Sequence, residues 1–229
     1  MLGLESATPR SLLLSLDVRR AGLSFRAGQA VVVGRHGQPE RRPYSIASSP
    51  DRADEGTLEL LIGVDAAGSP GPHLANLAIG VAIDVEGPRG DFTFPETPEH
   101  ASLLFVGGGT GIAPLRSMMD HARRHHPAAR LALLYSARRA DEFAFINEFR
   151  ALEAQGHLLL HQTVTREDGA WAGSRGRIGR AHFEAVLTDP ANTLCFVCGP
   201  PAMVTDAMST LAALGVPDAA IRTEQWLRR

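Results

Sequence analysis

A glycine-rich run, GGGTGIAP at residues 107–114, is suited to holding a phosphate group. It follows an apolar stretch with strand character and precedes a stretch with helical periodicity. Glycine lets a backbone approach a pyrophosphate closely, and the first turn of a helix offers free N–H groups and the positive end of its dipole. Pro114 fits that first turn, where a missing N–H costs no helical bond. A tight turn without a ligand is the alternative, because the run lacks the third glycine of the usual dinucleotide fingerprint.

A second group of chemically capable residues is the segment RRPYSIAS at residues 41–48. On a strand, Arg42 and Tyr44 project to one side and Ser45 to the other. A guanidinium next to a phenol ring can pair with a phosphate while the ring stacks on a flat heterocycle. A solvated arginine beside an ordinary strand tyrosine is the simpler interpretation of this segment alone.

All 23 basic residues are arginine, because the sequence contains no lysine. A P-loop lysine, a Schiff-base lysine and a lysine general base are therefore excluded. Any bound anion must be held by arginine, hydroxyl groups or backbone N–H groups.

The composition narrows the class of protein further. A net charge of −2 argues against a nucleic-acid-binding protein, and two cysteines in 229 residues exclude a disulfide framework and a four-thiolate iron–sulfur cluster. No apolar run reaches the roughly 20 residues that span a bilayer. We therefore expect a cytoplasmic protein without a membrane partner.

The elements that must position these residues change character near residue 98. Before it, short β-rich runs alternate with Gly and Pro turns, which is typical of an antiparallel barrel or sandwich, and one short helical stretch is expected near Gly71 to Leu77. After it, strands alternate with helices, including helices over Ile112 to Arg124 and Asp141 to Gln155. This alternation predicts a doubly wound parallel sheet with its ligands at the carboxyl ends of the strands. We place two domains at residues 1–98 and 99–229.

Three motifs in this order, RPYS, GGGTGIAP and CGPPAM at residues 198–203, resemble those of the ferredoxin–NADP reductase superfamily. The resemblance covers nearly the whole chain. It implies an FAD-binding antiparallel Greek-key β-barrel followed by a nicotinamide-nucleotide-binding α/β domain.

The resemblance also implies roles for residues of the first domain. Arg42 and Pro43 belong to the motif that binds the FAD pyrophosphate, Tyr44 stacks on the isoalloxazine, and Ser45 hydrogen-bonds near flavin N5. The segment around Ile62 contacts the flavin through its backbone. The segment Gly71, Pro72, His73 and Leu74 matches the start of the helix that binds the FAD phosphates, but Leu74 stands where a Ser or Thr is expected.

In the second domain, the matching positions imply contacts with the nicotinamide nucleotide. They are Gly109, Thr110, Gly111, Cys198, Gly199 and Pro200. The counterpart of Cys198 lies beside the reacting nicotinamide, and Glu224 assists in proton or nicotinamide handling. Trp226 either shields the flavin face or serves only in packing.

The choice between NADPH and NADH depends on residues after the strand that ends at Val164. Thr165 and Arg166 resemble the Ser-Arg pair that holds the 2′-phosphate in NADP-dependent members, and Arg175 and Arg177 match the other half of that site. Acidic residues 167 and 168 could instead bind a ribose diol. We favour NADPH and keep NADH open.

Two other patterns have simpler interpretations. Cys195 and Cys198 look like a redox pair, but positions three apart on a strand face opposite ways. His121 and His125 share a helix face, but no third ligand accompanies them in the sequence, so we expect no metal.

The resemblance implies an FAD-dependent NAD(P)H oxidoreductase in which hydride passes from the nicotinamide to FAD. The acceptor we favour is a separate one-electron carrier such as a ferredoxin, a flavodoxin or the iron–sulfur component of an oxygenase. Two alternatives are a reductase of small molecules such as free flavin or oxygen, and a non-catalytic nucleotide-binding protein that has lost FAD.

Overall fold

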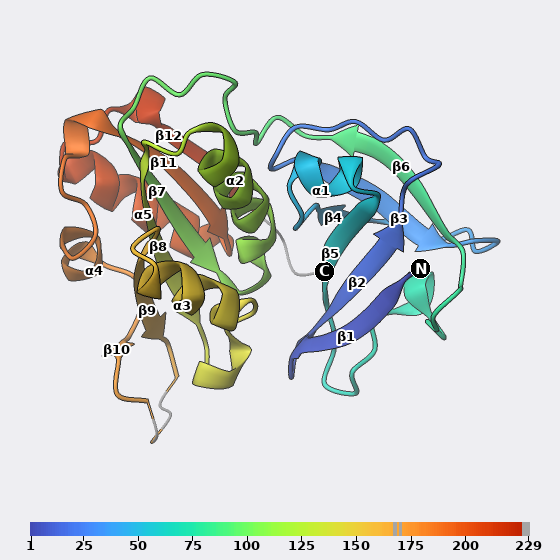
Figure 1. Cartoon of the computed structure of the whole chain (residues 1–229). Helices are drawn as coiled ribbons and strands as arrows, with labels where there is room; N and C mark the ends of the chain where they lie inside the picture. The colour runs from blue at the N-terminus through green and yellow to red at the C-terminus, as the bar shows by residue number, and fades with distance from the viewer. Residues whose placement is uncertain (167–168, 170, 226–229) are drawn as a thin grey trace.

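The computed structural model describes residues 1–166, 169 and 171–225, which form a β-rich N-terminal half and an α/β C-terminal half (Figure 1). This order of an antiparallel part followed by a doubly wound parallel sheet confirms the fold class predicted from the sequence. Within the described residues, no helix has the length and apolar character needed to cross a membrane.

The β-rich half consists of two three-stranded antiparallel sheets. One has the order β1-β2-β5, with bounds Gly3–Thr8, Ser11–Asp17 and Thr57–Gly63. The other has the order β4-β3-β6, with bounds Arg42–Ser45, Ala30–Arg35 and Ile83–Arg89. An antiparallel bridge between Ile46 and Leu60 joins them. Alternating apolar residues of both sheets face one core, including Leu14, Val31, Val33, Leu58 and Leu60.

Two elements of this half escape sequence reasoning. Strand β1 has the sequence GLESAT, which lacks an apolar alternation, and it forms because it pairs with β2. Helix α1 (Pro50–Asp54) is a single short turn that begins with a proline. The helix expected near Gly71 to Leu77 is only a 3₁₀ turn, η1 (Pro72–Leu74), because Ala75 returns to an extended conformation.

The α/β half contains a six-stranded parallel sheet in the order β10-β9-β8-β7-β11-β12. The strand bounds, in chain order from β7, are Ser102–Gly108, Arg130–Ala137, Leu159–Val164, Ser174–Arg175, Thr193–Gly199 and Ile221–Gln225. From β7 the chain adds strands β8, β9 and β10 on one side and β11 and β12 on the other, so the strand order reverses between β7 and β11. Ligands are expected at the carboxyl ends of these two strands.

Helices cover both faces of this sheet, with α2 and α3 in front of it in Figure 1 and α4 and α5 behind. Their bounds are Ile112–His125, Ile146–Ala154, Arg180–Glu184 and Pro201–Ala213. Single 3₁₀ turns complete the half: η2 (Gly109–Gly111), η3 (Ala140–Glu142), η4 (Pro190–Asn192) and η5 (Asp218–Ala220).

The prediction of one continuous helix over Asp141 to Gln155 is wrong. The chain forms η3, leaves helical geometry, and starts α3 only after Phe145, whose φ is +59°. The cause is the buried Tyr135, whose hydroxyl accepts the Ala144 N–H at 3.2 Å while its ring packs edge-on against Phe143. These contacts hold Phe143 and Ala144 in the core, so the helix cannot run through them.

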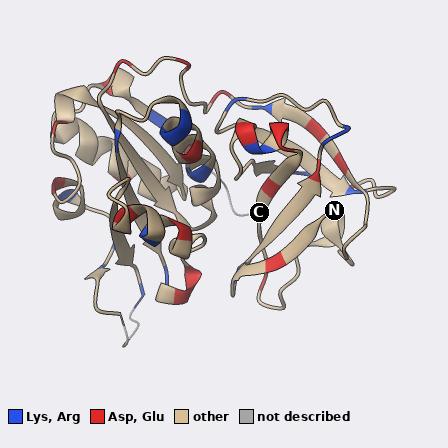
Figure 2. Cartoon of the chain, viewed as in Figure 1, with Lys and Arg blue, Asp and Glu red and all other residues tan. Residues whose placement is uncertain are grey.

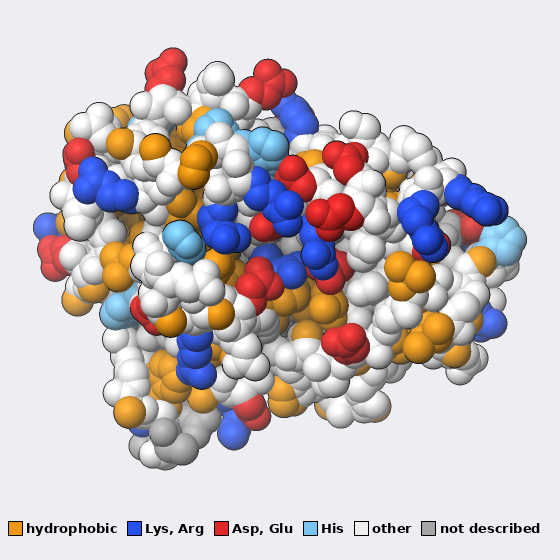
Figure 3. All heavy atoms as spheres, in the orientation of Figure 1, with side chains coloured by type: hydrophobic (Ala, Val, Ile, Leu, Met, Phe, Trp, Pro, Cys, Tyr) orange, Lys and Arg blue, Asp and Glu red, His pale blue; other side chains and the backbone are white. Residues whose placement is uncertain are grey.

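Polar contacts join α2 to the β-rich half. The Arg116 guanidinium donates to Glu59 of β5 at 2.7 Å, to the Ala47 carbonyl at 3.0 Å and to Glu148 of α3 at 2.8 Å. Ser117 Oγ donates to the Ser48 carbonyl at 2.7 Å. Figure 3 shows acidic and basic side chains gathered along this boundary. The side of α2 that carries Arg116 and Ser117 thus sets the position of the α/β half relative to the β-rich half.

Candidate functional site

A cavity of about 830 Å³ lies between the two halves at the carboxyl ends of the parallel strands. A volume of this size is ordinary for a cofactor site. Eight of the residues that sequence reasoning assigned to cofactor binding line it, from both halves: Arg42, Tyr44, Gly71, Gly109, Thr110, Thr165, Arg177 and Pro200. Another hollow, of about 730 Å³, lies at the opposite end of the sheet, where Ser102, Arg130 and Thr193 begin their strands, and none of the expected site residues lines it.

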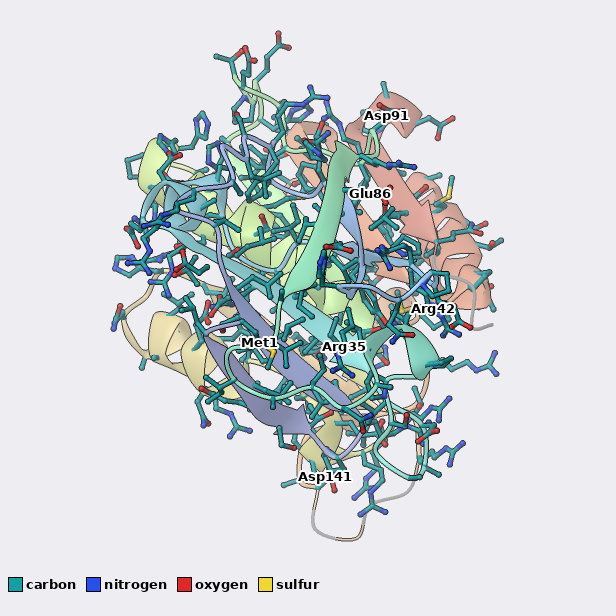
Figure 4. The ribbon with its side chains drawn as sticks, turned by 90° about the vertical axis from the view of Figure 1, so that its right-hand side faces the viewer. Met1, Arg35, Arg42, Glu86, Asp91 and Asp141 are labelled. Atoms are coloured by element: carbon teal, nitrogen blue, oxygen red, sulfur yellow. The ribbon has the colours of Figure 1, made fainter. Side chains whose placement is uncertain are left out.

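On the barrel side, Arg42 and Tyr44 of β4 face the cavity, while Ser45 does not line it, as strand alternation predicts. Figure 4 views the molecule from the β-rich half and labels Arg42 on the flank of the barrel. A Cβ atom placed on Gly71 would lie 3.7 Å from the Arg42 guanidinium. Gly71 itself has a φ of +99°, so a side chain at that position would be strained as well as close to the arginine.

His73 is a fully buried partner of Tyr44. Its Nε2 lies 2.8 Å from the Tyr44 hydroxyl, and the two rings stack with centroids 5.8 Å apart and planes inclined by 15°. Burial and the neighbouring charge of Arg42 lower the pKa of His73 to about 4, and burial raises the pKa of Tyr44 to about 12. Both groups are therefore neutral at pH 7. His73 Nδ1 is buried and has no hydrogen-bond partner among the residues that the structure describes.

The depressed pKa of His73 predicts a pH-dependent stability. An unfolded histidine has a pKa near 6.5, so below that pH the unfolded chain binds a proton that the folded chain takes up only near pH 4. We expect the stability from His73 to be complete above pH 6.5 and to fall as the pH drops toward 4. Thermal unfolding at pH 7 and pH 5 measures this. The His73→Phe variant should lose less melting temperature between the two, and an equal loss would contradict the assignment.

Three residues of the barrel side that the sequence assigns to FAD binding lie outside the cavity lining, although Leu61 and Gly63, on either side of Ile62, belong to it. The Leu74 side chain is fully buried in the barrel core and its N–H bonds to the Gly71 carbonyl at 3.2 Å, so neither is free for a phosphate. The Ile62 side chain is also fully buried, and its backbone pairs with Leu12 of β2. Pro43 pairs in register with Val32 and is exposed. None of the three lines the cavity.

The glycine-rich turn is packed too tightly for other residues. Gly109 has a φ of +56°. A Cβ atom on Gly111 would collide with the Cys198 carbonyl, and one on Gly108 would lie 2.6 Å from the Met203 sulfur. The turn therefore lies directly against the end of β11, which brings the glycine-rich run and the CGPP segment, including Gly199, into contact.

The three residues expected to be catalytic converge at the junction of the halves. Ser45 Oγ of β4 donates to Glu224 Oε2 of β12 at 3.3 Å, and Cys198 Sγ of β11 lies 3.8 Å from the same oxygen. Parallel pairing sets Cys198 directly beside Glu224. Burial raises the pKa of Glu224, and burial together with the Glu224 carboxylate raises the pKa of the Cys198 thiol. Cys198 is thus a protonated thiol, while Glu224 holds a proton more readily than an ordinary carboxylate.

The second cysteine does not form a redox pair with it. Both thiols are free and buried, and Cys195 Sγ points to the Thr193 carbonyl at 4.0 Å. Burial raises the pKa of Cys195 to about 12, so it is an unreactive core residue.

The residues expected around a 2′-phosphate are dispersed. Thr165 and Arg177 line the cavity, whereas Arg166 and Arg175 do not. The Arg166 N–H bonds to the Arg138 carbonyl at 2.9 Å, and the Arg175 guanidinium donates to the Trp171 carbonyl at 2.6 Å. Residues 167 and 168 and Trp226 lie outside the described residues.

Sequence reasoning missed several polar residues of the cavity. They include Arg10, Ser136, Arg138 and Glu142. Ser136 and Arg138 follow a simple signal, because they lie at the carboxyl end of β8, next to the strand that carries the glycine-rich turn. Arg10 lies in the turn between β1 and β2, and it could not be found without knowing that β1 exists.

Two family models match this chain. One, described as Oxidoreductase FAD-binding domain, matches residues 4–94, and the other, described as Oxidoreductase NAD-binding domain, matches residues 105–209. The first covers Arg42 to Gly71, and the second covers the glycine-rich turn and the CGPP segment.

Curated relatives extend the likeness along the chain. Ferredoxin–NADP reductase B of Sorangium cellulosum (strain So ce56) is 34% identical over 214 residues, which cover 88% of this chain and 85% of the relative. Oxidoreductase NAD-binding domain-containing protein 1 of Danio rerio is 33% identical, with 93% and 85% covered. A component of the Na(+)-translocating NADH-quinone reductase of Haemophilus influenzae (strain 86-028NP) is 30% identical over 77% of this chain, but the match spans less than half of that relative, 46%.

Solved structures share the fold. The Amycolatopsis cytochrome P450 reductase GcoB superposes with a TM-score of 0.85 at 26% identity, covering 98% of this chain and 67% of that one. A ferredoxin NADP+ reductase from Neisseria gonorrhoeae, solved with bound FAD and NADP, gives a TM-score of 0.79 at 23% identity over 98% and 96% of the two chains. With both family models matched in order and a relative aligned over most of its length, the chain belongs to the ferredoxin–NADP reductase superfamily of FAD- and nicotinamide-nucleotide-binding oxidoreductases.

Proposed function

We propose that this chain moves hydride from NADPH or NADH to FAD and delivers the electrons to a separate one-electron carrier protein. The observation that carries the proposal is the convergence of Ser45, Cys198 and Glu224, from three distant segments, at the junction of the two halves that also enclose the cavity. When bound, FAD accepts hydride from a nicotinamide and releases electrons singly.

The barrel side of the cavity fits the phosphates and ring of FAD. Arg42 offers a guanidinium to the pyrophosphate, and Tyr44 offers a ring held in place by His73. When the Tyr44 hydroxyl donates to Nε2, the buried His73 Nδ1 carries the imidazole proton, and a phosphate oxygen near Gly71 would accept it. The neutral His73 imidazole would thus replace the phosphate-binding hydroxyl of the Ser or Thr expected at position 74.

The α/β side fits a nicotinamide nucleotide. The turn at Gly109 to Gly111 would offer backbone N–H groups to the nucleotide phosphates at the start of α2, and this turn lies against the Cys198 carbonyl at the end of β11. Ser45 Oγ donates to the Glu224 carboxylate at the junction of the two halves, and the pair would hold a proton in a fixed position for the bound cofactors. The chain contributes orientation and proton placement, and the redox chemistry belongs to the cofactors.

A spectral titration tests this function. The purified protein, reconstituted with FAD if needed, should be yellow and should lose its flavin absorbance when NADPH or NADH is added without oxygen. Reduction of ferricyanide, followed by reduction of cytochrome c with and without added ferredoxin, distinguishes a carrier-dependent reductase from one that serves small molecules. A colourless protein that cannot be reconstituted with FAD would overturn the proposal.

For the coenzyme we propose NADPH, held by Arg138 after β8 and Arg177 after β10. Arg138 and Arg177 line the cavity, and Arg166 is tied to Arg138 through the backbone. Relatives carry both names, since one is called an NADP reductase and another an NADH-quinone reductase. The proposal therefore depends on whether these arginines meet a 2′-phosphate.

We expect Arg177→Ala, which removes a guanidinium from the cavity lining, to weaken NADPH binding by roughly 10- to 100-fold and NADH binding little, because a charge-assisted hydrogen bond contributes about 1.5–3 kcal/mol. Dissociation constants for both nucleotides measure this. Arg150→Ala, an exposed arginine on α3, is the matched control. Equal weakening of both nucleotides would contradict the 2′-phosphate assignment.

A further inference from the structure

Three potential metal ligands meet where α1 packs against α2, away from the cavity. Asp51 comes from α1 of the β-rich half, and His121 and His125 lie one turn apart on α2. His125 Nε2 is 2.8 Å from Asp51 Oδ1, His121 Nδ1 is 3.5 Å from Asp51 Oδ2, and one ligand atom from each residue lies within 4.8 Å of the others. The third ligand that sequence reasoning did not find is thus supplied by a distant segment of the other half.

Two buried atoms of this cluster form no hydrogen bond with any described residue. They are Asp51 Oδ2 and His121 Nδ1, which face one another at 3.5 Å as a long ion-pair contact. Such a buried pair is rare, and a group between the two atoms would satisfy both. A cation between them would do so.

Neighbouring rings fix the position of His121. The His125 ring lies on the same face of α2, with its centroid 4.4 Å from that of His121. The aromatic ring of Phe94 packs edge-on against His121 and restricts its orientation. Asp120 is occupied by Ser49 and Arg124, and therefore leaves Asp51 as the carboxylate of the cluster.

We propose that Asp51, His121 and His125 form a zinc-class divalent metal site that clamps the two halves together. Two imidazoles and a carboxylate suit Zn²⁺, with water completing a tetrahedron. Bonds of about 2.0–2.1 Å place tetrahedral ligand atoms about 3.3 Å apart. The three ligand atoms are within a small side-chain adjustment of that spacing.

The site is independent of the proposed redox function, because none of its residues lines the cavity. Its consequence is mechanical. α1 follows directly after the β4 segment that carries Arg42 and Tyr44, and α2 begins at the glycine-rich turn. Figure 2 shows charged residues on both helices. The bound ion would fix these two helices to each other and so stabilise the native arrangement.

The experiment uses the complete flavin-loaded protein after treatment with EDTA. Zn²⁺ is titrated by calorimetry, Co²⁺ by its difference spectrum in the visible region, and thermal unfolding is followed with and without Zn²⁺. We expect one equivalent of Zn²⁺, a tetrahedral Co²⁺ spectrum and a higher melting temperature with Zn²⁺. The His121→Ala and His125→Ala variants should weaken Zn²⁺ binding by at least about 100-fold, more than loss of an outer-shell partner.

His36→Ala is the matched control, because His36 pairs with Asp84 at 2.7 Å elsewhere on the barrel. It should bind Zn²⁺ like the unaltered protein. Asp51→Asn keeps the shape of the cluster and serves if a histidine variant fails to retain flavin. Absence of binding to the unaltered protein, or equal binding by the variant that lacks both His121 and His125, would overturn the proposal.

Discussion

Replacing Arg116 by methionine is expected to lower the free energy of unfolding by about 3–5 kcal/mol. The Arg116 side chain is 15% exposed and Glu59 only 11%, so their 2.7 Å ion pair is largely shielded from water. Methionine preserves much of the packing over the Phe145 ring, which lies 4.3 Å from the guanidinium carbon. It leaves Glu59 charged and buried without its partner, and that is the source of the loss.

Urea unfolding followed by circular dichroism measures this effect. Glu148, the other carboxylate paired with Arg116, is 38% exposed and can turn toward water, so its loss of a partner adds little. Arg124→Met is the control, because Arg124 is 41% exposed and its pairing with Asp120 should contribute less than about 1 kcal/mol. Adding Glu59→Gln to Arg116→Met should recover part of the loss. A change below about 1 kcal/mol for Arg116→Met would show that the pair is solvated in solution.

The second large effect is expected from Glu224→Gln, which should slow reduction of bound FAD by roughly 100-fold without reducing the flavin content. The amide keeps the shape of the side chain and can still accept the Ser45 hydrogen bond, but it cannot gain or lose a proton at that oxygen. Because burial raises the pKa of Glu224, the rate should titrate above the range of an ordinary glutamate, and that titration should disappear in the variant.

Stopped-flow measurement of flavin absorbance after mixing with NADPH or NADH tests this prediction. Glu142→Gln is the matched control, since Glu142 lines the same cavity but makes no contact with Ser45 or Cys198 among the hydrogen bonds of the described residues. A Glu224→Gln rate within a few-fold of the unaltered protein, at every pH tested, would remove Glu224 from the proposed chemistry and leave it a packing residue.

The elements that could be predicted from the sequence are those whose local hydrophobic pattern matches their burial in the folded protein. β7, β8 and β11 are continuous apolar runs that become buried central strands, and the glycine-rich turn follows the first of them. The apolar periodicity of residues 141–155 predicts one helix. The structure interrupts it because the buried Tyr135 hydroxyl accepts the Ala144 N–H, and this tertiary contact leaves no local signal in the sequence.

The same distinction applies to the site. Arg42, Tyr44 and Gly109 were found through motifs, because the chemistry needs those residue types at fixed spacing. His73 was named only as part of a segment, and its pairing with Tyr44 depends on the turn at Gly71 that brings the two rings together. Asp51 could not be connected with His121 before the packing of α1 on α2 was known.

Helix α2 carries both the glycine-rich turn at its start and the contacts with the β-rich half along its length, from Arg116 to His125. The spacing between the two walls of the cavity is therefore set by the hydrogen-bonded backbone of this helix, and residues 95–101 only connect the two halves. Lengthening that segment with glycine and serine would leave the spacing unchanged, which makes residues 95–101 the place to insert a reporter or to divide the chain into two complementing fragments.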